Sequence, residues 1–385
     1  MKKIVCLILL LCCVVGFSAC EQEEISSSVD SILAILGSQK QDGHGYQIAV
    51  ISAPDSIEES SYNQSCYDGV LAFMESRDGV DTVTALTCDS VDQAETLAFV
   101  QNVINQYDIF ILLGDLFTDI YSVASSYSNK YFILVDPAQI NYSDTAVPAN
   151  LCILNFKEEE SGFLAGLAAA LTSETGKVAA VTEMALDSYQ NYQLGFAAGV
   201  NFSNRYYLTK VEIIQMDAYA GTDSAGNKIE GNYLGETDDA DAAYTITKSL
   251  ATLGADVIFV AAGTAGEGAY RAATEAGVKI IASDQEMDGI PGGASATALL
   301  TAVYKDTTDA IAWVLETIDE QAFPGGNYLL GAGEGMIHYF SPAEAGVLSK
   351  EDDEILAENY ILLTEGTIIP PSVANGYEPT SFPGY

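Results

Sequence analysis

The chain has 385 residues, which is more than a single hydrophobic core usually holds, so we expect two domains. Its 54 Asp and Glu residues far outnumber its 15 Lys and Arg residues and give a formal net charge of −39 at pH 7. Such a surface repels phosphate, which excludes a general binding surface for nucleic acid or for anionic membranes.

The first twenty residues have the pattern of a secretion signal rather than of a folded segment. Two lysines precede an apolar run over 4–15 that is too short to span a bilayer comfortably. Small residues then lead to Cys20, as in the lipobox of lipoproteins. We expect 1–20 to be a lipoprotein signal peptide, Cys20 to be the lipid anchor and 21–45 to be a polar tether. An ordinary signal peptide with an incidental cysteine is the alternative.

The first strand is predicted at 47–51, an apolar run bounded by turn residues. A helix follows it at helical apolar spacing, with Ser60 or Ser61 as the N-cap. Tyr62 and Asn63 stand at this turn, and open α/β sheets bind ligands at the carboxyl ends of their strands. They offer a stacking face and a hydrogen-bonding amide. Alternatively, Tyr62 packs against the helix and Asn63 caps it.

Strands and helices alternate over the next hundred residues, which predicts a parallel sheet with crossover helices. Helices are expected from Tyr62, Val91 and Asp119. The predicted strands are 48–51, 83–86, 109–113, 131–135 and 151–155. This region therefore forms one open, doubly wound domain.

A second α/β unit begins at Phe156. Its first helix contains small residues such as Gly162 and Gly166, which favour close helix packing, and Gly176 ends it as a C-cap. Further strands are predicted at 177–181, 210–216, 257–261 and 279–284, and helices at 189–200, 239–253 and 266–276.

Five blocks of the sequence, in order, resemble those of one known family. The run S-Y-N-Q-S-C-Y-D-G at 61–69 is similar to S-F-N-Q-S-x-Y-E-G, and residues 156–177 are similar to F-x-x-E-E-x-x-F-L-A-G…T-G-K-V. Q-L-G-F-A-A-G at 193–199, the strand ending in Asp284 and the block at 299–310 complete the set. The chain resembles the basic membrane protein family, lipid-anchored substrate-binding proteins of ABC importers that bind purine nucleosides.

The resemblance implies a type I periplasmic-binding-protein fold, with two doubly wound parallel-sheet lobes joined by hinge strands. Because such chains cross back, we expect 285–320 to join the first lobe. The expected parts are 46–155 with 285–320 as the N-terminal lobe, 156–284 with 321–345 as the C-terminal lobe, and 346–385 as a last helix, 350–363, and a surface or disordered tail.

The resemblance also implies a ligand site. Tyr62 takes the place of the family's first stacking Phe, and Asn63 that of its base-reading Asn. Asp136 matches a base-contacting acid, although Pro137 after it leaves a simple turn acid as the alternative. Asp284 and Lys305 match the ribose ligands. Lys305 is expected on a helix face, where a surface salt bridge is the alternative.

Two further positions complete the implied site. Tyr219 matches the second stacking aromatic, with Tyr233 as the alternative, because this chain carries an insertion at 220–237 that could act as a lid or contact the permease. Gly263 begins a Gly-rich turn that superficially fits a phosphate cradle. It lacks the G-K-[ST] continuation, so we expect Gly263 to let the backbone approach the sugar.

Three cysteines follow Cys20, namely Cys66, Cys88 and Cys152, and none has metal-ligand spacing. We expect buried free thiols, with a Cys66–Cys88 disulfide as the alternative, and no cofactor or metal.

The leading functional prediction is a monomeric, lipid-anchored receptor on the extracytoplasmic side of the cell membrane, which delivers a purine nucleoside to an ABC permease without catalysis. A sensor or carrier of another small ligand, such as a sugar or a signal molecule, is the main alternative. An enzyme that cleaves nucleosides with paired carboxylates is a third, but no pair has a specific spacing.

Overall fold

The computed structural model describes residues 45–54, 56–57, 61–75, 77, 81–137, 147–223, 226–236, 239–284, 298–320, 322–340 and 348–385. The chain divides into two units, 1–45 and 46–385, and only the second is described below. The predicted signal peptide, the Cys20 anchor and nearly all of the tether therefore lie outside the described residues. Within those residues, no helix combines the length and the apolar character that crossing a membrane requires.

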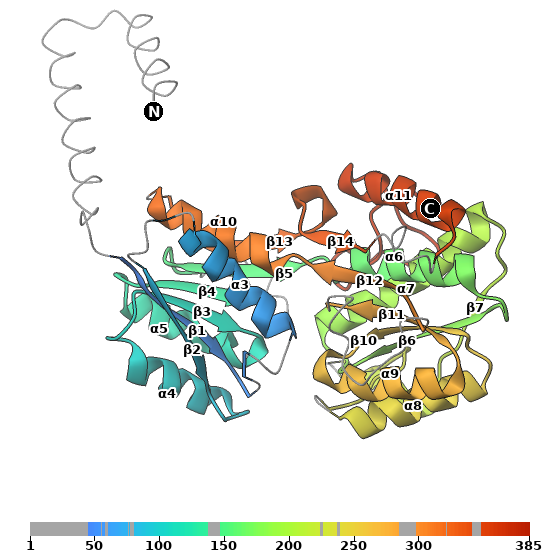
Figure 1. The fold of residues 1–385 in the computed structure, drawn as a ribbon, viewed down its shortest axis with the longest axis horizontal. Helices are drawn as coiled ribbons and strands as arrows, with labels where there is room; N and C mark the ends of the chain where they lie inside the picture. The colour runs from blue at the N-terminus through green and yellow to red at the C-terminus, as the bar shows by residue number, and fades with distance from the viewer. Residues whose placement is uncertain are drawn as a thin grey trace, which may run out of the picture. The chain divides into compact units, whose positions relative to one another are not determined.

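The first of two large sheets has the strand order β13-β5-β4-β3-β1-β2, and all its strands pair in parallel. Its strands are β1 (Gln47–Ser52), β2 (Thr82–Thr87), β3 (Ile109–Leu113), β4 (Tyr131–Val135), β5 (Leu151–Phe156) and β13 (Gly326–Leu330). The strands β3 and β4 in the middle of the sheet are continuous runs of apolar and aromatic residues, because helices cover both faces of a parallel sheet. Helices α3 and α10 lie on one face, and α4 and α5 lie on the other (Figure 1).

The second sheet has the order β14-β12-β11-β10-β6-β7, and only the pairing of β12 with β14 is antiparallel. Its strands are β6 (Lys177–Thr182), β7 (Glu212–Ile213), β10 (Val257–Ala261), β11 (Lys279–Ser283), β12 (Leu299–Lys305) and β14 (Ile337–Tyr339). A small antiparallel hairpin is formed by β8 (Gly221–Thr222) and β9 (Lys228–Ile229). The strand predicted at 210–216 is much shorter than expected, since only β7 pairs.

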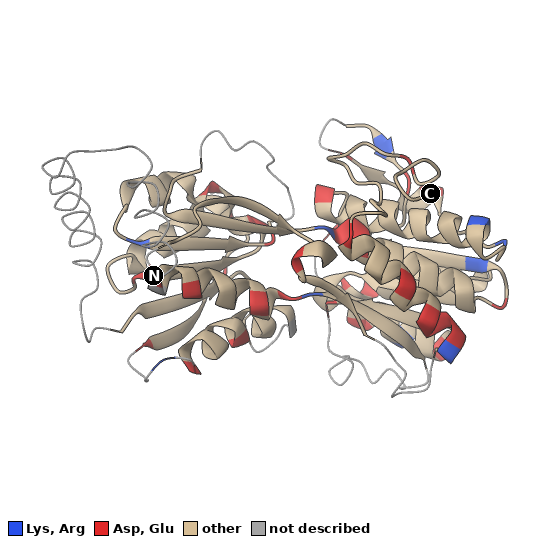
Figure 2. Cartoon of the chain, turned by 90° about the horizontal axis from the view of Figure 1, so that it is seen from above, with Lys and Arg blue, Asp and Glu red and all other residues tan. Residues whose placement is uncertain are grey.

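Helices pack on both sheets, and the ribbon carries more Asp and Glu positions than Lys and Arg positions (Figure 2). The helices of the first lobe are α3 (Ser61–Glu75), α4 (Gln93–Val103), α5 (Tyr121–Ser126) and α10 (Thr307–Asp319). Those of the second lobe are α6 (Glu158–Thr172), α7 (Asp187–Tyr206), α8 (Ala240–Thr252), α9 (Gly266–Ala276) and α11 (Lys350–Thr364).

Helices α6 and α7 approach each other closely through glycines. A Cβ atom on Gly166 would lie 2.1 Å from the carbonyl oxygen of Phe196, and one on Gly199 would lie 2.1 Å from that of Phe163. No larger residue fits either position without moving backbone. The close packing predicted for this small-residue helix is confirmed.

The two-lobe α/β architecture is as predicted, but two segments belong to the opposite lobe from the one expected. Strand β12 lies within 285–320 yet pairs with β11 in the second sheet, whereas α10 packs on α3 in the first lobe. Strand β13 lies within 321–345 yet pairs with β5 in the first sheet. An apolar run predicts a strand but not its pairing partner, so the sequence alone could not assign these two strands to their lobes.

Most of the C-terminal tail lies at the surface, as one of the two expected alternatives states, but a few buried residues anchor it to the second lobe. Ile368 and Phe382 are buried, and the Phe382 ring packs edge-on to Phe163 of α6 at 6.2 Å between centroids. The prediction of buried free thiols is confirmed, because Cys66, Cys88 and Cys152 are all unpaired and buried.

Candidate functional site

Two aspartates occupy equivalent positions at strand ends in the two lobes. Asp136 follows β4 and its amide donates to the carbonyl of Leu154 in β5, while Asp284 follows β11 and its amide donates to that of Val303 in β12. Both residues have a φ of 54°, in the left-handed region that non-glycine residues rarely adopt. Backbone strain of this kind is concentrated at functional sites.

Lys305, the last residue of β12, joins these two aspartates. Its Nζ lies 2.5 Å from Asp136 Oδ2 and 3.5 Å from Asp284 Oδ2, and its backbone amide donates to Asp284 Oδ1 at 3.0 Å. The lysine side chain is only 7% exposed. Since Asp136 comes from the first sheet and the other two residues from the second, this ion-pair group links the lobes. Lys305 lies at the end of a strand, so the prediction that it lies on a helix face is wrong.

The electrostatics of this group keep Lys305 charged. Burial acts to lower the pKa of Lys305, but Asp136 and Asp284 outweigh burial and raise the pKa well above its ordinary value. One ammonium then faces two carboxylates, so the three side chains together carry a charge of −1 when all are ionised.

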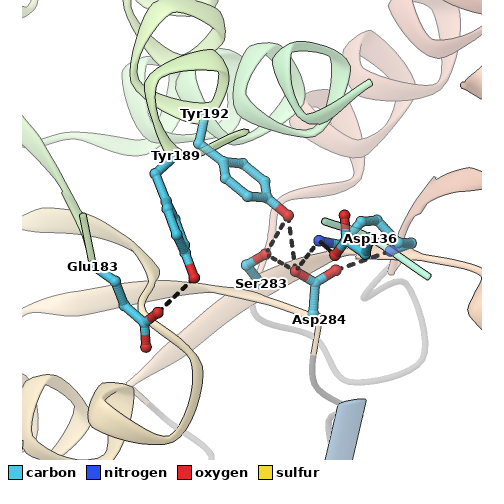
Figure 3. A network of polar contacts seen from close by, with 7 residues as sticks. Asp136, Glu183, Tyr189, Tyr192, Ser283 and Asp284 are labelled. Atoms are coloured by element: carbon cyan, nitrogen blue, oxygen red, sulfur yellow. Dashed lines mark hydrogen bonds and ion pairs between the residues drawn. The ribbon is translucent and has the colours of Figure 1, made fainter. Parts of the chain in front are cut away.

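Aromatic rings surround the ammonium group. Lys305 Nζ lies 5.5 Å from the ring centroid of Tyr62, 5.6 Å from that of Tyr192 and 6.0 Å from that of Phe156. These are cation–π distances. The Tyr192 hydroxyl also donates to Asp284 Oδ2 at 2.8 Å, and Ser283 Oγ donates to the same oxygen at 2.8 Å (Figure 3).

Two buried polar groups beside the ion-pair group have no hydrogen-bond partner among the described residues. One is the Tyr62 hydroxyl, in the first turn of α3. The other is the Glu158 carboxyl, at the first residue of α6, which is 1% exposed and has both oxygens unpaired. Burial raises the pKa of Glu158 well above its ordinary value, and Asp136 raises it further. Buried polar atoms without partners are rare and point to a bound molecule or to water.

A second tyrosine–carboxylate pair lies at the end of β6 in the second sheet. Tyr189 of α7 donates its hydroxyl to Glu183 Oε2 at 2.5 Å, and Glu183 follows β6 (Figure 3). Gly263 follows β10 with a φ of 46°, and a Cβ atom there would lie 2.9 Å from Glu183 Oε1. Burial raises the pKa of Tyr189 and Glu183 raises it further, so Tyr189 remains a hydrogen-bond donor.

The structure brings Tyr62, Asp136, Asp284 and Lys305 together, as the sequence predicted, and gives the other candidates different surroundings. Asn63 donates its side-chain amide to the Ser56 carbonyl at 3.3 Å and so ties down the loop before α3. Gly263 borders Glu183 rather than the ion-pair group.

The two tyrosines considered for the second stacking face have structural contacts. Tyr219 lies in a short 3-10 helix (Asp217–Tyr219) and packs against the core of the second lobe. Tyr233 is 4% exposed, and its hydroxyl donates to the Glu230 carbonyl at 3.3 Å.

The insertion at 220–237 is built onto the end of β6. Buried Asn232 donates to the carbonyls of Ala180 and Ile214, and the amide of Gly235 donates to the Glu183 carbonyl at 2.9 Å. The described part of the insertion therefore fixes the backbone that carries Glu183.

Sequence reasoning missed five polar residues of this region: Glu158, Glu183, Tyr189, Tyr192 and Ser283. The signals were present but ambiguous. The two tyrosines stand three residues apart near the start of a helix, a spacing that equally suits a core stripe. The glutamates follow strand ends, where turn acids are common.

Comparisons with known proteins agree with this architecture. Residues 46–368 match the family described as ABC transporter substrate-binding protein PnrA-like. Basic membrane protein C of Borreliella burgdorferi is 27% identical over 356 residues, covering 88% of this chain and 93% of that protein. Basic membrane protein A1 of Borrelia garinii is 26% identical over 270 residues, covering 67% of this chain and 70% of the relative.

Solved structures share the fold at lower identity. An ABC transporter solute-binding protein from Aeropyrum pernix superposes with a TM-score of 0.67 at 19% identity, covering 85% of this chain and 94% of that one. One from Conexibacter woesei gives 0.64 at 17% identity, with 85% and 99% covered. These likenesses establish the type I periplasmic-binding-protein fold.

Proposed function

Because the chain belongs to the PnrA-like (Bmp) family of ABC transporter substrate-binding proteins, we propose that it binds a purine nucleoside between its two lobes at the Lys305 group. The observation that carries the proposal is the buried Lys305 ammonium, which is held by carboxylates from both lobes next to an aromatic ring. A ligand at this point touches both lobes at once. Binding there can therefore bring the lobes together, and a permease can recognise this closed, ligand-bound conformation.

The chemistry of the group suits a nucleoside. Tyr62 offers a flat face for the base and a hydroxyl that has no other partner among the described residues. Asp136 can accept from the edge of the base, while Asp284 and Lys305 can accept from and donate to vicinal hydroxyls of the ribose. With a net charge of −1 on the three ionised side chains, an uncharged ligand is favoured over a phosphorylated one.

We further propose that the protein is held at the extracytoplasmic face of the cell membrane by a lipid on Cys20 and acts as a monomer. The sequence pattern before Cys20 supports the anchor. The faces of α6 and α7 that pack against each other are buried within the chain, so they are not open to a second subunit.

A carrier of another small polyol is the second candidate, and one observation favours it. The unpaired Tyr62 hydroxyl would accept or donate a hydrogen bond to a sugar as readily as to a nucleoside. A purine offers a large aromatic face to the same ring, whereas a sugar does not, so the two candidates differ in their need for Tyr62.

Calorimetry against nucleosides, free bases, sugars and amino acids tests the proposal. We expect adenosine, guanosine or inosine to bind with a micromolar or tighter Kd, and Tyr62→Ala and Asp284→Ala each to weaken binding by at least about tenfold, or 1.4 kcal/mol. Chromatography of the recovered ligand should show an intact nucleoside rather than free base. Binding of sugars alone, or unchanged nucleoside affinity in both variants, would reject the nucleoside.

A further inference from the structure

Three cations gather at the edge of the second sheet that lies opposite the Lys305 group. Strands β6, β7, β10 and β11 run parallel, so their amino ends share one edge, and the crossover helix α7 returns the chain to it. Lys177 begins β6, Lys210 precedes β7, and Arg205 lies in the last turn of α7. Blue segments are visible at this end of the second lobe (Figure 2). Within the described part of the chain, none of the three forms an ion pair with a carboxylate.

Large apolar side chains are exposed around these cations. Leu208 is 75% exposed, Leu253 is 50% exposed and Tyr206 is 49% exposed. Lys177 Nζ donates to the Leu253 carbonyl at 3.2 Å, and Arg205 Cζ lies 5.5 Å from the ring centroid of Tyr206. Exposed apolar groups that adjoin one another mark a contact surface, whereas single ones do not. This surface is called the basic end below and consists of Lys177, Arg205, Tyr206, Leu208, Lys210 and Leu253.

The loop between α7 and β7 holds two of these residues in a strained conformation. Leu208 has a φ of 60° and Lys210 a φ of 61°, and the two aspartates of the candidate site are the other described non-glycine residues with a positive φ. Asn204 fixes the loop, because its side chain accepts from the Val211 amide at 2.7 Å and donates to the Val211 carbonyl at 2.8 Å. A leucine in the left-handed region is a rare outlier, and such strain is concentrated at functional sites. Here it displays Leu208 to solvent.

The acidity of the whole chain excludes a general surface for anionic membranes but does not decide the charge of this end. Charges more than about 8 Å away are largely screened at physiological ionic strength, so the nearest neighbours matter most. Two exposed acids, Glu174 and Glu212, lie at the same edge. A third, Asp256, accepts from the backbone amides of Glu174 and Thr175 at 2.7 and 2.8 Å, so its charge is already bound by the protein.

We propose that the basic end is a contact surface for the phospholipid head groups of the membrane. Leu208 and Leu253 enter the apolar boundary, Tyr206 lies at the level of the head groups, and the three cations bind phosphate while their stems follow the apolar side chains. A protein partner needs a pocket shaped for the protruding leucine, whereas a lipid layer accepts it without one. This contact goes beyond the proposed delivery of a ligand, and the lipid proposed on Cys20 keeps the basic end within reach of the membrane.

Sedimentation with vesicles tests the proposal. A form of the protein that begins after Cys20 lacks the lipid and keeps the compact unit 46–385 with its core. It is mixed, at about 0.15 M salt, with vesicles of phosphatidylcholine alone or with about 30% phosphatidylglycerol. Each Lys or Arg at an anionic surface contributes about fivefold to binding, and the two neighbouring acids offset part of this. We therefore expect at least about tenfold stronger binding to the anionic vesicles than to the neutral ones.

Charge reversal at matched positions locates the contact. The double variant Arg205→Glu with Lys210→Glu should weaken binding to anionic vesicles at least about tenfold. Lys228→Glu with Lys350→Glu makes the same change of net charge at two exposed lysines outside the basic end, and it should change binding less than about twofold.

A second pair of variants tests the apolar part of the surface. Leu208→Asn removes the apolar side chain and suits a left-handed conformation better than leucine does, so the variant should be at least as stable as the wild type in thermal unfolding. Its binding to anionic vesicles should nevertheless fall at least about fivefold. Val91→Asn alters a residue that is 72% exposed outside the basic end, and it should leave vesicle binding unchanged.

Several outcomes would overturn the membrane contact. One is no binding of the wild type to anionic vesicles, and another is equal loss of binding in the two charge-reversal variants. Self-association in sedimentation velocity that is lost in Arg205→Glu with Lys210→Glu would assign the basic end to a second copy of the chain instead. An oligoglutamate peptide that binds as tightly as the vesicles, with no effect of Leu208→Asn, would assign it to an acidic protein. None of these results depends on whether a nucleoside binds, so this proposal and the proposed function fail separately.

Discussion

Replacing Lys305 with methionine tests the centre of the structure most directly. The side chain is 7% exposed and its partner Asp136 is 13% exposed, so little solvent screens their bond. The substitution keeps an unbranched side chain of similar length but removes the only ammonium between two carboxylates. The charge of the group then changes from −1 to −2, if both aspartates stay ionised, in a largely desolvated place.

The expected cost follows from this burial. Removing one partner of a buried ion pair typically destabilises a protein by about 3–5 kcal/mol, because the other charge remains buried without compensation. The raised pKa of Lys305 fixes the pH window. A lysine whose folded pKa is raised contributes its full stabilisation below its unfolded pKa of about 10.4 and loses it only as pH rises through the folded pKa. The loss should therefore be fully present at pH 7.5.

Urea unfolding at pH 7.5 measures the loss, with far-UV circular dichroism and the fluorescence of the single tryptophan as probes. That residue, Trp313, packs edge-on to Tyr328 at 5.4 Å in the first lobe. The exposed pair of Lys228 with Asp217 supplies the control, since Lys228→Met should change the free energy of unfolding little. Adding Asp136→Asn to Lys305→Met should recover part of the loss. A loss below about 1 kcal/mol, or no recovery in the double variant, would refute the reasoning.

Three other predictions concern the surrounding scaffold. Burial raises the pKa of Glu159 to about 8, so the folded state keeps a proton that the unfolded state releases above about pH 4.3, and the wild-type protein loses stability as pH rises. In urea unfolding, Glu159→Gln should therefore raise the free energy of unfolding, relative to the wild type, by on the order of 3–4 kcal/mol more at pH 8 than at pH 5. An effect that does not depend on pH would contradict the raised pKa. Gly199→Ala should lower the free energy of unfolding by about 1–3 kcal/mol or more, because the added Cβ would lie 2.1 Å from the Phe163 carbonyl oxygen. A variant more stable than the wild type would contradict this and would show that α6 and α7 can move apart. In a form of the protein that begins after residue 20, a thiol reagent at pH 8 should label no cysteine until urea is added. The reason is that all three thiols are buried and that burial raises the pKa of Cys66 to about 12. Rapid labelling of the folded protein would contradict the burial of these thiols.

Local sequence patterns were sufficient for most strands and helices. The runs at β3 and β4 are continuously apolar and bounded by turn residues, so both were predicted to the residue. Helix α9 was predicted with the same bounds that it has in the structure, ending before Gly277 in a left-handed conformation. These elements are determined by their own residues, which is why the sequence alone identifies them.

Pairing between distant segments could not be predicted in the same way. Strands β12 and β13 both lie in the last third of the chain, and nothing in either sequence indicates that β12 joins β11 and β13 joins β5. The tail is a similar case, because buried Phe382 packs on Phe163, which lies more than two hundred residues earlier in the chain. These arrangements depend on the packing of the whole chain.

The predictions of the site show the same difference between local sequence patterns and long-range packing. Asp136, Asp284 and Lys305 were grouped by the family resemblance, and only the structure shows that Lys305 ends a strand rather than lying on a helix face. Tyr189 and Tyr192 reach the site from a helix, and their roles depend on the direction of that helix relative to the sheet edge. Tyr192 is nearly fully buried, which is also what a core tyrosine would show, and its contacts with Asp284 and Lys305 distinguish it.

The pairing of Lys305 also restricts what can bind beside it. A ligand that takes Asp136 must replace a charge-assisted bond of 2.5 Å, so it has to bring a hydrogen-bond donor of its own to that carboxylate. It must also leave Lys305 with an acceptor, because an unpaired buried ammonium is costly. An apolar molecule satisfies neither condition, and a phosphate supplies acceptors but no donor while adding negative charge to an acidic group. A molecule with donors on a flat base and on a sugar satisfies both conditions, which supports the proposed nucleoside over a simple anion or an apolar ligand.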